Sequence, residues 1–338
     1  MSRAPLLELQ RVFKRFEKTP DAAERIARLL GANARAQVVH AVDGVDLALA
    51  QGEVVGLAGE SGCGKSTLGR IAAGLIEPTR GTRRWRGGEA APRTGDERRR
   101  TRLAAQMIFQ DPYASLNPRM RVEDLVGEAP VVHGIVPKAG KRAYVAELLN
   151  RVGLDASAMR RFPHQFSGGQ RSRVGIARAL AVRPELLVCD EPVAALDVSI
   201  QAQVLNLFLS LREQLGLGCL FISHDLGVVR HVSDRVMIMY LGRIVESAPT
   251  AELYASPNHP YTQGLLASVP RLASSAANRR RAYAPVQGEI PLPLAPPPGC
   301  HYHPRCPYAM PRCRSEAPQL IEIAPLRYSA CHLNEAGS

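Results

Sequence analysis

A glycine-rich loop at residues 59–66, with the sequence GESGCGKS, constrains the fold of this chain more than any other feature. It matches the full P-loop pattern, and it stands between an apolar segment, 53–58, that predicts a strand and a segment, 67–75, that predicts a helix. The glycines let successive backbone N–H groups face phosphate oxygens, and the helix N-terminus adds its positive dipole end. We therefore expect an α/β core in which one strand ends at a phosphate-binding site.

The side chains of this loop predict ATP and Mg²⁺ as ligands. Lys65 is a mobile cation for the β- and γ-phosphates, and Ser66 offers a hydroxyl to Mg²⁺. Thr67 can add a hydroxyl to the α-phosphate. The predicted ATP-binding residues of the loop are Gly59, Glu60, Ser61, Gly62, Cys63, Gly64, Lys65, Ser66 and Thr67.

A second segment supplies the acidic half of such a site. Residues 186–189 predict a buried strand, and Asp190 and Glu191 follow at its C-terminal end, where ligand sites of open α/β sheets lie. Asp190 would hold Mg²⁺ through its water shell, and Glu191 would orient or deprotonate the attacking water. Two acids after a strand can also cap a helix, but together with the P-loop they predict phosphoryl transfer.

The order of the predicted elements indicates a largely parallel sheet covered by helices. Strands are expected at 6–16 and 38–49, the second with a turn at Asp43 and Gly44, and residues 17–37 are expected to form a surface insertion. A helical block at 123–182 precedes strand 186–190, helix 200–215 and strand 219–223. Six prolines within residues 285–298 predict a stiff, extended linker.

Composition and charge disfavour several classes of protein. The sequence has no uninterrupted apolar run near the roughly 20 residues of a membrane-spanning helix, and its first residues lack the build of a signal peptide, so we expect it in the cytoplasm. The net charge is +12, and nine arginines face three acids within residues 80–102. This pattern favours an anionic membrane surface over nucleic acid, and no nucleic-acid partner is expected.

Residues 166–170, with the sequence FSGGQ, begin another predicted helix. A serine and two glycines at a helix N-terminus form a second anion site, so one chain carries two phosphate-binding helix ends. The motif resembles the signature of the ABC ATPase family, with Phe166 in place of the commoner leucine. The resemblance implies that two cassettes close head to tail around two ATP molecules. The residues expected to face the γ-phosphate of a partner's P-loop are Ser167, Gly168, Gly169 and Gln170.

Further positions resemble the remaining motifs of this family. Gln110 is similar to the Q-loop glutamine, which approaches Mg²⁺ and the attacking water, and Asp197 lies in a segment that resembles the D-loop. His224, at the end of a predicted strand, resembles the switch histidine that contacts the γ-phosphate. Phe16 resembles the aromatic residue that stacks on adenine, with Phe13 as its rival.

The resemblance implies one set of catalytic residues and one set of Mg²⁺ ligands. The sequence departs from the family pattern at Ala194, where relatives usually have a serine. The alanine lacks the hydroxyl that the serine would place near the expected dimer interface. The implied catalytic residues are Glu191, His224 and Gln110. The implied Mg²⁺ ligands are Ser66, Gln110 and Asp190.

The implied fold class is α/β, the P-loop NTPase fold of an ABC cassette: a RecA-like core with an antiparallel β subdomain and a helical subdomain. We place the nucleotide-binding domain at residues 1–257, with the helical subdomain at about 111–182, and a cysteine-containing extension at 258–338. Longer strings resemble the oligopeptide/dipeptide importer ATPases, in particular the second of their two ATPase subunit types. These strings are 59–70, 110–120, 195–203 and 258–270.

The resemblance therefore implies the ATP-hydrolysing motor of an importer for di- or oligopeptides. Implied partners are a paralogous ATPase subunit in a heterodimer, two transmembrane permease subunits and an external solute-binding protein. The subunit would lie peripherally on the cytoplasmic face of the inner membrane. Two alternatives stay open, namely a soluble ABC ATPase that acts on ribosomes or DNA, and an importer of a non-peptide solute such as nickel.

Four cysteines cluster after the proline-rich linker, at Cys300, Cys306, Cys313 and Cys331. Four thiolates can bind a 4Fe-4S cluster or a tetrahedral zinc ion, or form two disulfides, and their spacing alone does not decide. The pattern resembles that of importer ATPases whose relatives hold a 4Fe-4S cluster. That resemblance favours a structural cluster over zinc and over a reduced set without metal.

Overall fold

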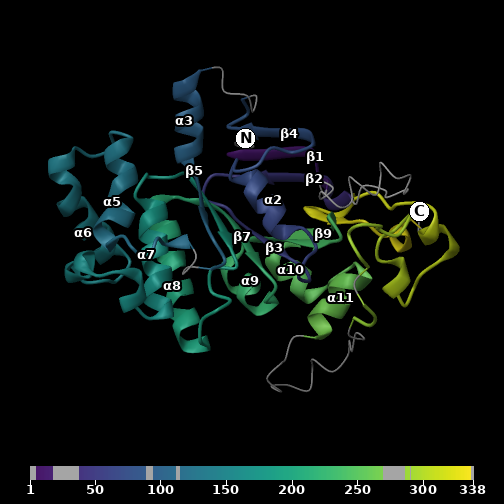
Figure 1. Cartoon of the computed structure of the whole chain (residues 1–338). Helices are drawn as coiled ribbons and strands as arrows, with labels where there is room; N and C mark the ends of the chain where they lie inside the picture. The colour runs from purple at the N-terminus through teal and green to yellow at the C-terminus, as the bar shows by residue number, and fades with distance from the viewer. Residues whose placement is uncertain are drawn as a thin grey trace, which may run out of the picture.

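The computed structural model of this chain describes residues 5–17, 38–88, 94–111, 115–268, 286–289 and 291–335. The surface insertion expected at 17–37 lies, apart from its first residue, outside the described residues. The described elements form a central sheet, a smaller antiparallel sheet, a helical lobe and a C-terminal extension (Figure 1).

Within the described part of the chain, the central sheet contains eight strands, from β3 of the P-loop region to β10 and β11 of the C-terminal extension. Its strand order is β10-β11-β9-β8-β3-β7-β6-β5, and the five strands from β8 to β5 run parallel. Every residue of β3, β6 and β7 is buried, as expected where helices cover both faces. The strands are β3 (Val54–Ala58), β5 (Ala105–Ile108), β6 (Leu186–Asp190), β7 (Gly218–Ser223), β8 (Arg235–Tyr240), β9 (Arg243–Pro249), β10 (Ile321–Ala324) and β11 (Arg327–Ser329).

Helices approach both faces of this sheet very closely at glycines. A Cβ atom at Gly69 of α2 (Lys65–Ala72) would lie 2.5 Å from Ile222 Cδ1 on one face. On the other face, a Cβ atom at Gly56 of β3 would lie 2.4 Å from the Ser233 hydroxyl, just after α9 (Leu226–Val232). Because these contacts leave no room for a side chain, they fix the depth at which α2 and α9 sit on the sheet.

The antiparallel sheet has the order β2-β1-β4, with β1 (Leu7–Glu17), β2 (Val38–Leu49) and β4 (Arg80–Trp85). The expected turn at Asp43 and Gly44 is wrong, because β2 continues through both residues. Asp43 pairs with Phe13, and the register shifts between Val12 and Phe13. Gly44 has φ +72°, so the Asp-Gly pair serves a strand irregularity and not a chain reversal.

The helical lobe confirms the helical spacing predicted after residue 123, but as separate helices. It contains α5 (Val122–Val132), α6 (Lys141–Arg151) and α7 (Gly168–Leu180), and a loop with Gly134 at φ +69° separates α5 from α6. Val145, Leu149 and Val174 are buried between these helices in one continuous core. α8 (Val198–Leu215) joins the lobe to the sheet, with Phe208 packed on Phe221.

The C-terminal extension folds back onto the cassette. After α10 (Thr250–Ala255) and α11 (Pro260–Ala267), the chain returns through residues 291–335, which are drawn in yellow-green to yellow in Figure 1. The Pro293 carbonyl accepts a hydrogen bond from the His40 backbone N–H in β2, at 3.0 Å. The hairpin β10–β11 then adds to the edge of β9, so the extension completes the central sheet.

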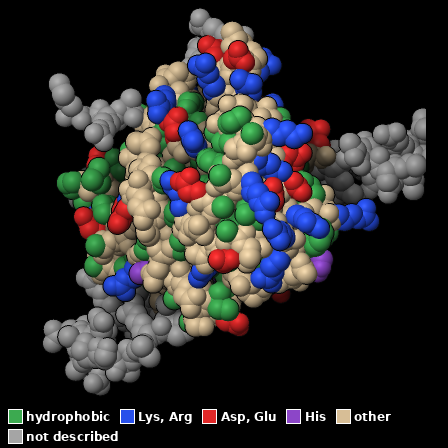
Figure 2. Space-filling model, turned by 90° about the vertical axis from the view of Figure 1, so that its left-hand side faces the viewer, with side chains coloured by type: hydrophobic (Ala, Val, Ile, Leu, Met, Phe, Trp, Pro, Cys, Tyr) green, Lys and Arg blue, Asp and Glu red, His purple; other side chains and the backbone are tan. Residues whose placement is uncertain are grey.

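The surface of the helical lobe mixes charge types. Figure 2 shows Lys and Arg side chains on this face interspersed with acidic and apolar ones. The arginine-rich α3 (Gly95–Ala104) has no buried residue and begins with a capping box between Thr94 and Glu97. Within the described residues, no helix has both the length and the apolar character needed to cross a membrane.

Candidate nucleotide-binding site

Three neighbouring parallel strands deliver the predicted site residues to one edge of the sheet. Ala58 of β3 pairs with Ser223 of β7, and Asp190 of β6 lies beside Ile222. The residues that follow these strands are therefore neighbours in space. They are Gly59, Glu191 and His224.

The P-loop requires two of its glycines because it is wedged between β2 and β8. A Cβ atom at Gly59, which has φ +153°, would lie 2.2 Å from the Met239 carbonyl oxygen. At Gly64, with φ +107°, it would lie 2.0 Å from the Ala41 carbonyl oxygen. Both positions combine a backbone conformation that favours glycine with a backbone atom in the place of any side chain.

The two polar side chains at the start of α2 are held by hydrogen bonds to the loop and to β6. Lys65 is buried, and its Nζ donates to the Gly59 and Glu60 carbonyl oxygens, each at 2.8 Å, so the ammonium lies over the loop. The Ser66 hydroxyl donates to Asp190 Oδ1 at 2.9 Å. Burial raises the pKa of the Asp190 carboxyl, against the opposing effect of the Ser66 hydrogen bond. Ser66 and Asp190, two of the expected Mg²⁺ ligands, thus lie within hydrogen-bond distance of each other and offer oxygen atoms, which Mg²⁺ prefers.

Glu191 is held by the two other predicted catalytic residues. Gln110 Nε2 donates to Glu191 Oε2 at 2.9 Å, and His224 Nδ1 lies 3.1 Å from Glu191 Oε1. Glu191 is buried and has φ +47°, a conformation rare outside glycine and often found at functional sites. The structure thus brings together Gln110, Glu191 and His224, and it fixes both oxygens of the carboxylate.

A cavity of about 690 Å³ opens over this edge of the sheet. Its volume falls in the range of about 300–1,000 Å³ typical of small-molecule sites. The lining residues are Gly59, Glu60, Ser61, Gln110, Asp111, Glu191, Ala194, Ala195, His224, Leu226 and Leu265.

The signature residues do not line this cavity. Ser167 caps α7, where its hydroxyl accepts from the Gln170 N–H at 3.4 Å while the Gln170 side chain accepts from the Ser167 N–H at 3.1 Å. Ser167 and Gly168 are exposed, and so is Asp197 at the start of α8. A Cβ atom at Gly169 would lie 2.3 Å from Ile200, which explains a second glycine at this helix end.

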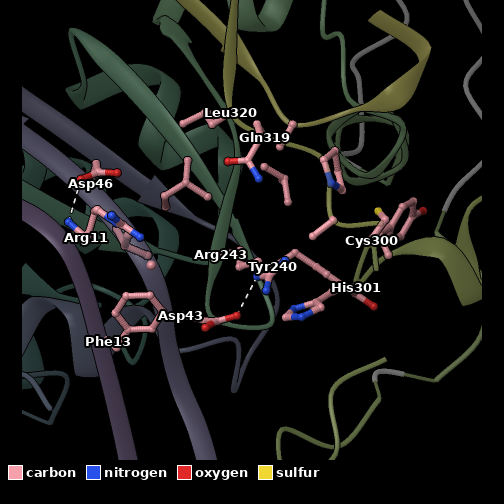
Figure 3. Close-up of a pocket in the computed structure, with 18 residues that line it drawn as sticks. Arg11, Phe13, Asp43, Asp46, Tyr240, Arg243, Cys300, His301, Gln319 and Leu320 are labelled. Carbon is pink, nitrogen blue, oxygen red and sulfur yellow. Dashed lines mark hydrogen bonds and ion pairs between the residues drawn. The ribbon is translucent and has the colours of Figure 1, made fainter. Parts of the chain in front are cut away.

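The two aromatic candidates for adenine differ in their surroundings. Phe13 lines a second cavity of about 440 Å³ between the antiparallel sheet and the C-terminal extension (Figure 3). Arg11, Asp43 and Cys300 lie around the same cavity. Phe16 is 44% exposed and lines neither cavity, with the Lys14 ammonium 5.2 Å from its ring centre. The Phe16 ring is therefore the more accessible of the two.

Two residues of the extension contact the P-loop, and sequence reasoning missed them. Arg305 forms a two-pronged ion pair with Glu60, at 2.7 and 2.9 Å. The Tyr261 hydroxyl accepts a hydrogen bond from the Glu60 N–H at 3.0 Å. Tyr261 stands in a string that resembles the importer branch and Arg305 directly precedes Cys306 of the cysteine cluster, but no local pattern links either residue to a loop more than 200 positions away.

The four C-terminal cysteines are free thiols that influence one another. Burial raises the pKa of Cys300, Cys306 and Cys331, the last to about 11, and charge on the other cysteines of the set raises it further. The set has the chemistry of a cluster ligand set. Among the described residues, however, no group of three or more His, Cys, Asp or Glu side chains is arranged to hold a metal ion.

Two protein families match different parts of this chain. Residues 42–194 match the family described as ABC transporter. Residues 245–313 match the family described as the C-terminal region of oligopeptide/dipeptide transporters. The first match covers the P-loop, the signature and Glu191, and the second covers α11 and the first three clustered cysteines.

Curated relatives match nearly the whole chain. The oligopeptide transport ATP-binding protein AppF of Bacillus subtilis is 50% identical over 296 residues, which span 87% of this chain and 90% of AppF. The di/tripeptide transport ATP-binding protein DppF of Pseudomonas aeruginosa is 47% identical over 294 residues, with 87% and 90% covered.

Solved structures confirm the predicted cassette fold. A dimeric bacterial ABC transporter cassette has a TM-score of 0.60 and 27% identity, and the match covers 72% of this chain and 98% of that one. A post-hydrolysis state of such a cassette with ADP and phosphate bound has the same TM-score at 26% identity. The predicted fold is thus shared with a cassette whose own structure holds ADP and phosphate.

Proposed function

This chain belongs to the ABC transporter ATPases, in the branch that carries the oligopeptide/dipeptide transporter C-terminal region, and from this premise we propose that it powers the import of peptides. The carrying observation is Glu191, held between Gln110 and His224 beside the P-loop. The peptide class rests on the relatives, whose names describe oligopeptide and di/tripeptide transport.

In the proposed reaction, Lys65 and the P-loop N–H groups bind the β- and γ-phosphates of ATP. Glu191 accepts a hydrogen bond from the attacking water and aligns it with the γ-phosphorus, while Gln110 and His224 keep the carboxylate in place. Ser66, Asp190 and Gln110 would hold Mg²⁺, which neutralises phosphate charge when it is bound. Phe16 would stack on adenine.

We propose that the exposed signature serves a partner's nucleotide. Ser167, Gly168, Gly169, Gln170 and Asp197 lie away from the cavity of their own chain, as a head-to-tail pair of cassettes requires. The expected partner is a paralogous ATPase subunit. Two permease subunits and an external solute-binding protein would complete the importer, with this subunit peripheral on the cytoplasmic face of the inner membrane.

In this assignment the nucleotide-binding domain spans residues 1–257, with a helical subdomain at about 111–182, and the extension spans 258–338. We propose Cys300, Cys306, Cys313 and Cys331 as ligands of a structural 4Fe-4S cluster, because these four free thiols act electrostatically on one another in a segment with few helices or strands. Visible absorbance with four iron atoms per chain in anaerobically purified protein is expected. Stoichiometric zinc, or four reduced thiols without metal, would contradict the cluster.

Reconstitution tests the transport function directly. The chain is reconstituted in vesicles with the proposed paralogous ATPase and permease subunits, and uptake of a labelled peptide is followed with ATP supplied on the side of the ATPases. We expect uptake that depends on ATP and on the binding protein. Co-purification with ribosomes, or uptake of nickel without uptake of peptide, would replace this proposal by one of its alternatives.

A further inference from the structure

We propose that the C-terminal extension is a working part of the ATP site, in which Arg305 and Tyr261 position Glu60, and Arg305 neutralises its charge, so that the P-loop can bind phosphate. This inference rests on the proposed function, because it assigns positioning residues to the same nucleotide site. It goes beyond that function because it places part of the site in a segment that follows the cassette.

The ion pair between Arg305 and Glu60 has the geometry of a strong, specific contact. Arg305 Nη1 lies 2.7 Å from Glu60 Oε2, and Nη2 lies 2.9 Å from Oε1, so both carboxylate oxygens are engaged. The side chains are only 5% and 23% exposed, respectively. Paired guanidinium and carboxylate groups in this arrangement fix orientation as well as charge.

The remaining polar groups of Glu60 are also held. Its N–H donates to the Tyr261 hydroxyl at 3.0 Å, and its carbonyl oxygen accepts from Lys65 Nζ at 2.8 Å. Two of these three anchors, Arg305 and Tyr261, come from beyond residue 257. The path of the loop at its second residue is therefore set largely by the extension.

Tyr261 belongs to a buried aromatic cluster, which Tyr240 and Tyr302 complete. Tyr261 packs edge-on against Tyr240 of β8, with ring centres 4.7 Å apart, and Tyr302 lies 5.3 Å from both rings. All three rings are almost fully buried. Arg305 also donates through Nε to the Gln287 carbonyl at 3.0 Å. Displacing Tyr261 or Arg305 would thus require repacking of this aromatic cluster.

Charge explains why the loop needs Arg305. Glu60 lines the cavity expected to receive ATP, and an unpaired carboxylate there would repel phosphate oxygens. It would also compete with phosphate for the Lys65 ammonium. Arg305 does not line this cavity, and its guanidinium neutralises the Glu60 carboxylate, so its loss should weaken ligands in proportion to their phosphate charge.

The test measures equilibrium binding of MgATP, MgADP and adenosine to the full-length chain carrying Arg305→Met. We expect the Kd for MgATP to rise about tenfold, the Kd for MgADP to rise less, and that for adenosine to stay unchanged. Arg305→Lys should recover part of the loss, and it keeps the test valid if the methionine variant unfolds. Arg312→Met is the matched control, because Arg312 pairs with Glu316 and Glu335 inside the extension.

A double-mutant cycle isolates the pair. In a Glu60→Gln background, Arg305→Met should change the Kd for MgATP less than twofold, because the charge that Arg305 neutralises is gone. An equal loss in both backgrounds, or an equal loss for adenosine and ATP, would overturn the inference. Unchanged MgATP binding in Arg305→Met would overturn it as well and leave the proposed function intact. A wild-type chain that binds no MgATP would refute the proposed function itself.

Discussion

The chain presents two helix N-termini built for phosphate, and their surroundings are opposite. At α2, the loop, Lys65 and Ser66 are surrounded by acids, by Gln110 and by anchors from the extension. At α7, the capping box of Ser167 and Gln170 closes on itself and faces outward. Both helices offer the positive end of their dipole to an anion, and in the proposed function the two ends have different tasks.

The two helix ends differ in which groups for ATP hydrolysis their own chain places beside them. The α2 end holds everything that depends on precise placement, because Glu191 and Asp190 are positioned within the same chain. In the proposed pair of cassettes, the α7 end contributes only donors, to a nucleotide held by the partner's P-loop. Substitutions at the α2 end should therefore act on a single chain, whereas those at α7 should act only in a pair.

The largest effect is expected at Glu191. Glu191→Gln keeps the shape and the contacts with Gln110 and His224 but removes the negative charge that holds the water. We expect ATP turnover to fall about 10³-fold while the Kd for MgATP changes little. Phosphate release and equilibrium binding measure the two quantities. Glu185→Gln, before the opposite end of β6, is the control, and substantial turnover in Glu191→Gln would refute the assigned role.

A smaller loss, in binding, is expected at Lys65. Lys65→Met removes the cation that lies over the loop, so the Kd for MgATP should rise about 100-fold in a single chain. Fluorescence titration with a labelled ATP measures this change. Lys141→Met also removes a lysine from the start of a helix and should leave binding unchanged. Equal losses in the two variants would mean that general destabilisation, and not phosphate contact, is responsible.

The signature tests the comparison most directly. Ser167→Ala removes the hydroxyl at the α7 end and should lower ATP turnover of the assembled pair roughly tenfold. Binding of MgATP to the isolated chain should not change. Thr94→Ala is matched to it, because it also removes a capping box, at α3. Weaker ATP binding by the isolated Ser167→Ala chain would show that α7 serves its own P-loop, and the comparison would fail.

The smallest effect is expected on folding stability at acidic pH. His259 caps α11 and accepts the Tyr261 N–H at 3.1 Å, and burial lowers the pKa of His259 from 6.5 to about 3. Below pH 6.5 the unfolded chain binds a proton that the folded chain refuses until about pH 3, so stability falls as pH falls through this window. The loss is at most about 1.4 kcal/mol per pH unit.

Urea unfolding at about pH 7 and about pH 5.5 measures this loss. His259→Asn can still accept the Tyr261 N–H but cannot titrate, so its stability should depend less on pH than that of the wild type. The control is His231→Asn, a substitution of an exposed histidine. If His259→Asn and the wild type lose equal stability, the anchor beneath the P-loop is not the acid-sensitive element.

Much of the α2 site could be predicted because its information is local. Residues 59–66 carry their own pattern, and Glu191 and His224 follow strands whose ends must meet at one edge of a parallel sheet. The contacts of Glu60 with Tyr261 and Arg305 span 201 and 245 positions, and no local pattern encodes them. The Asp43-Gly44 pair misled because the same residues suit a hairpin turn and a bulge.

The pairing of β11 with β9 predicts what happens when the C-terminal extension is removed. Without residues 258–338, the hydrogen-bonding edge of β9 now used by Tyr328, Ser329 and Ala330 would lie open to water. Exposed strand edges of this kind recruit other strands, so a shortened cassette should self-associate edge to edge. The last hairpin of the chain therefore guards the sheet against aggregation, in addition to its place in the fold.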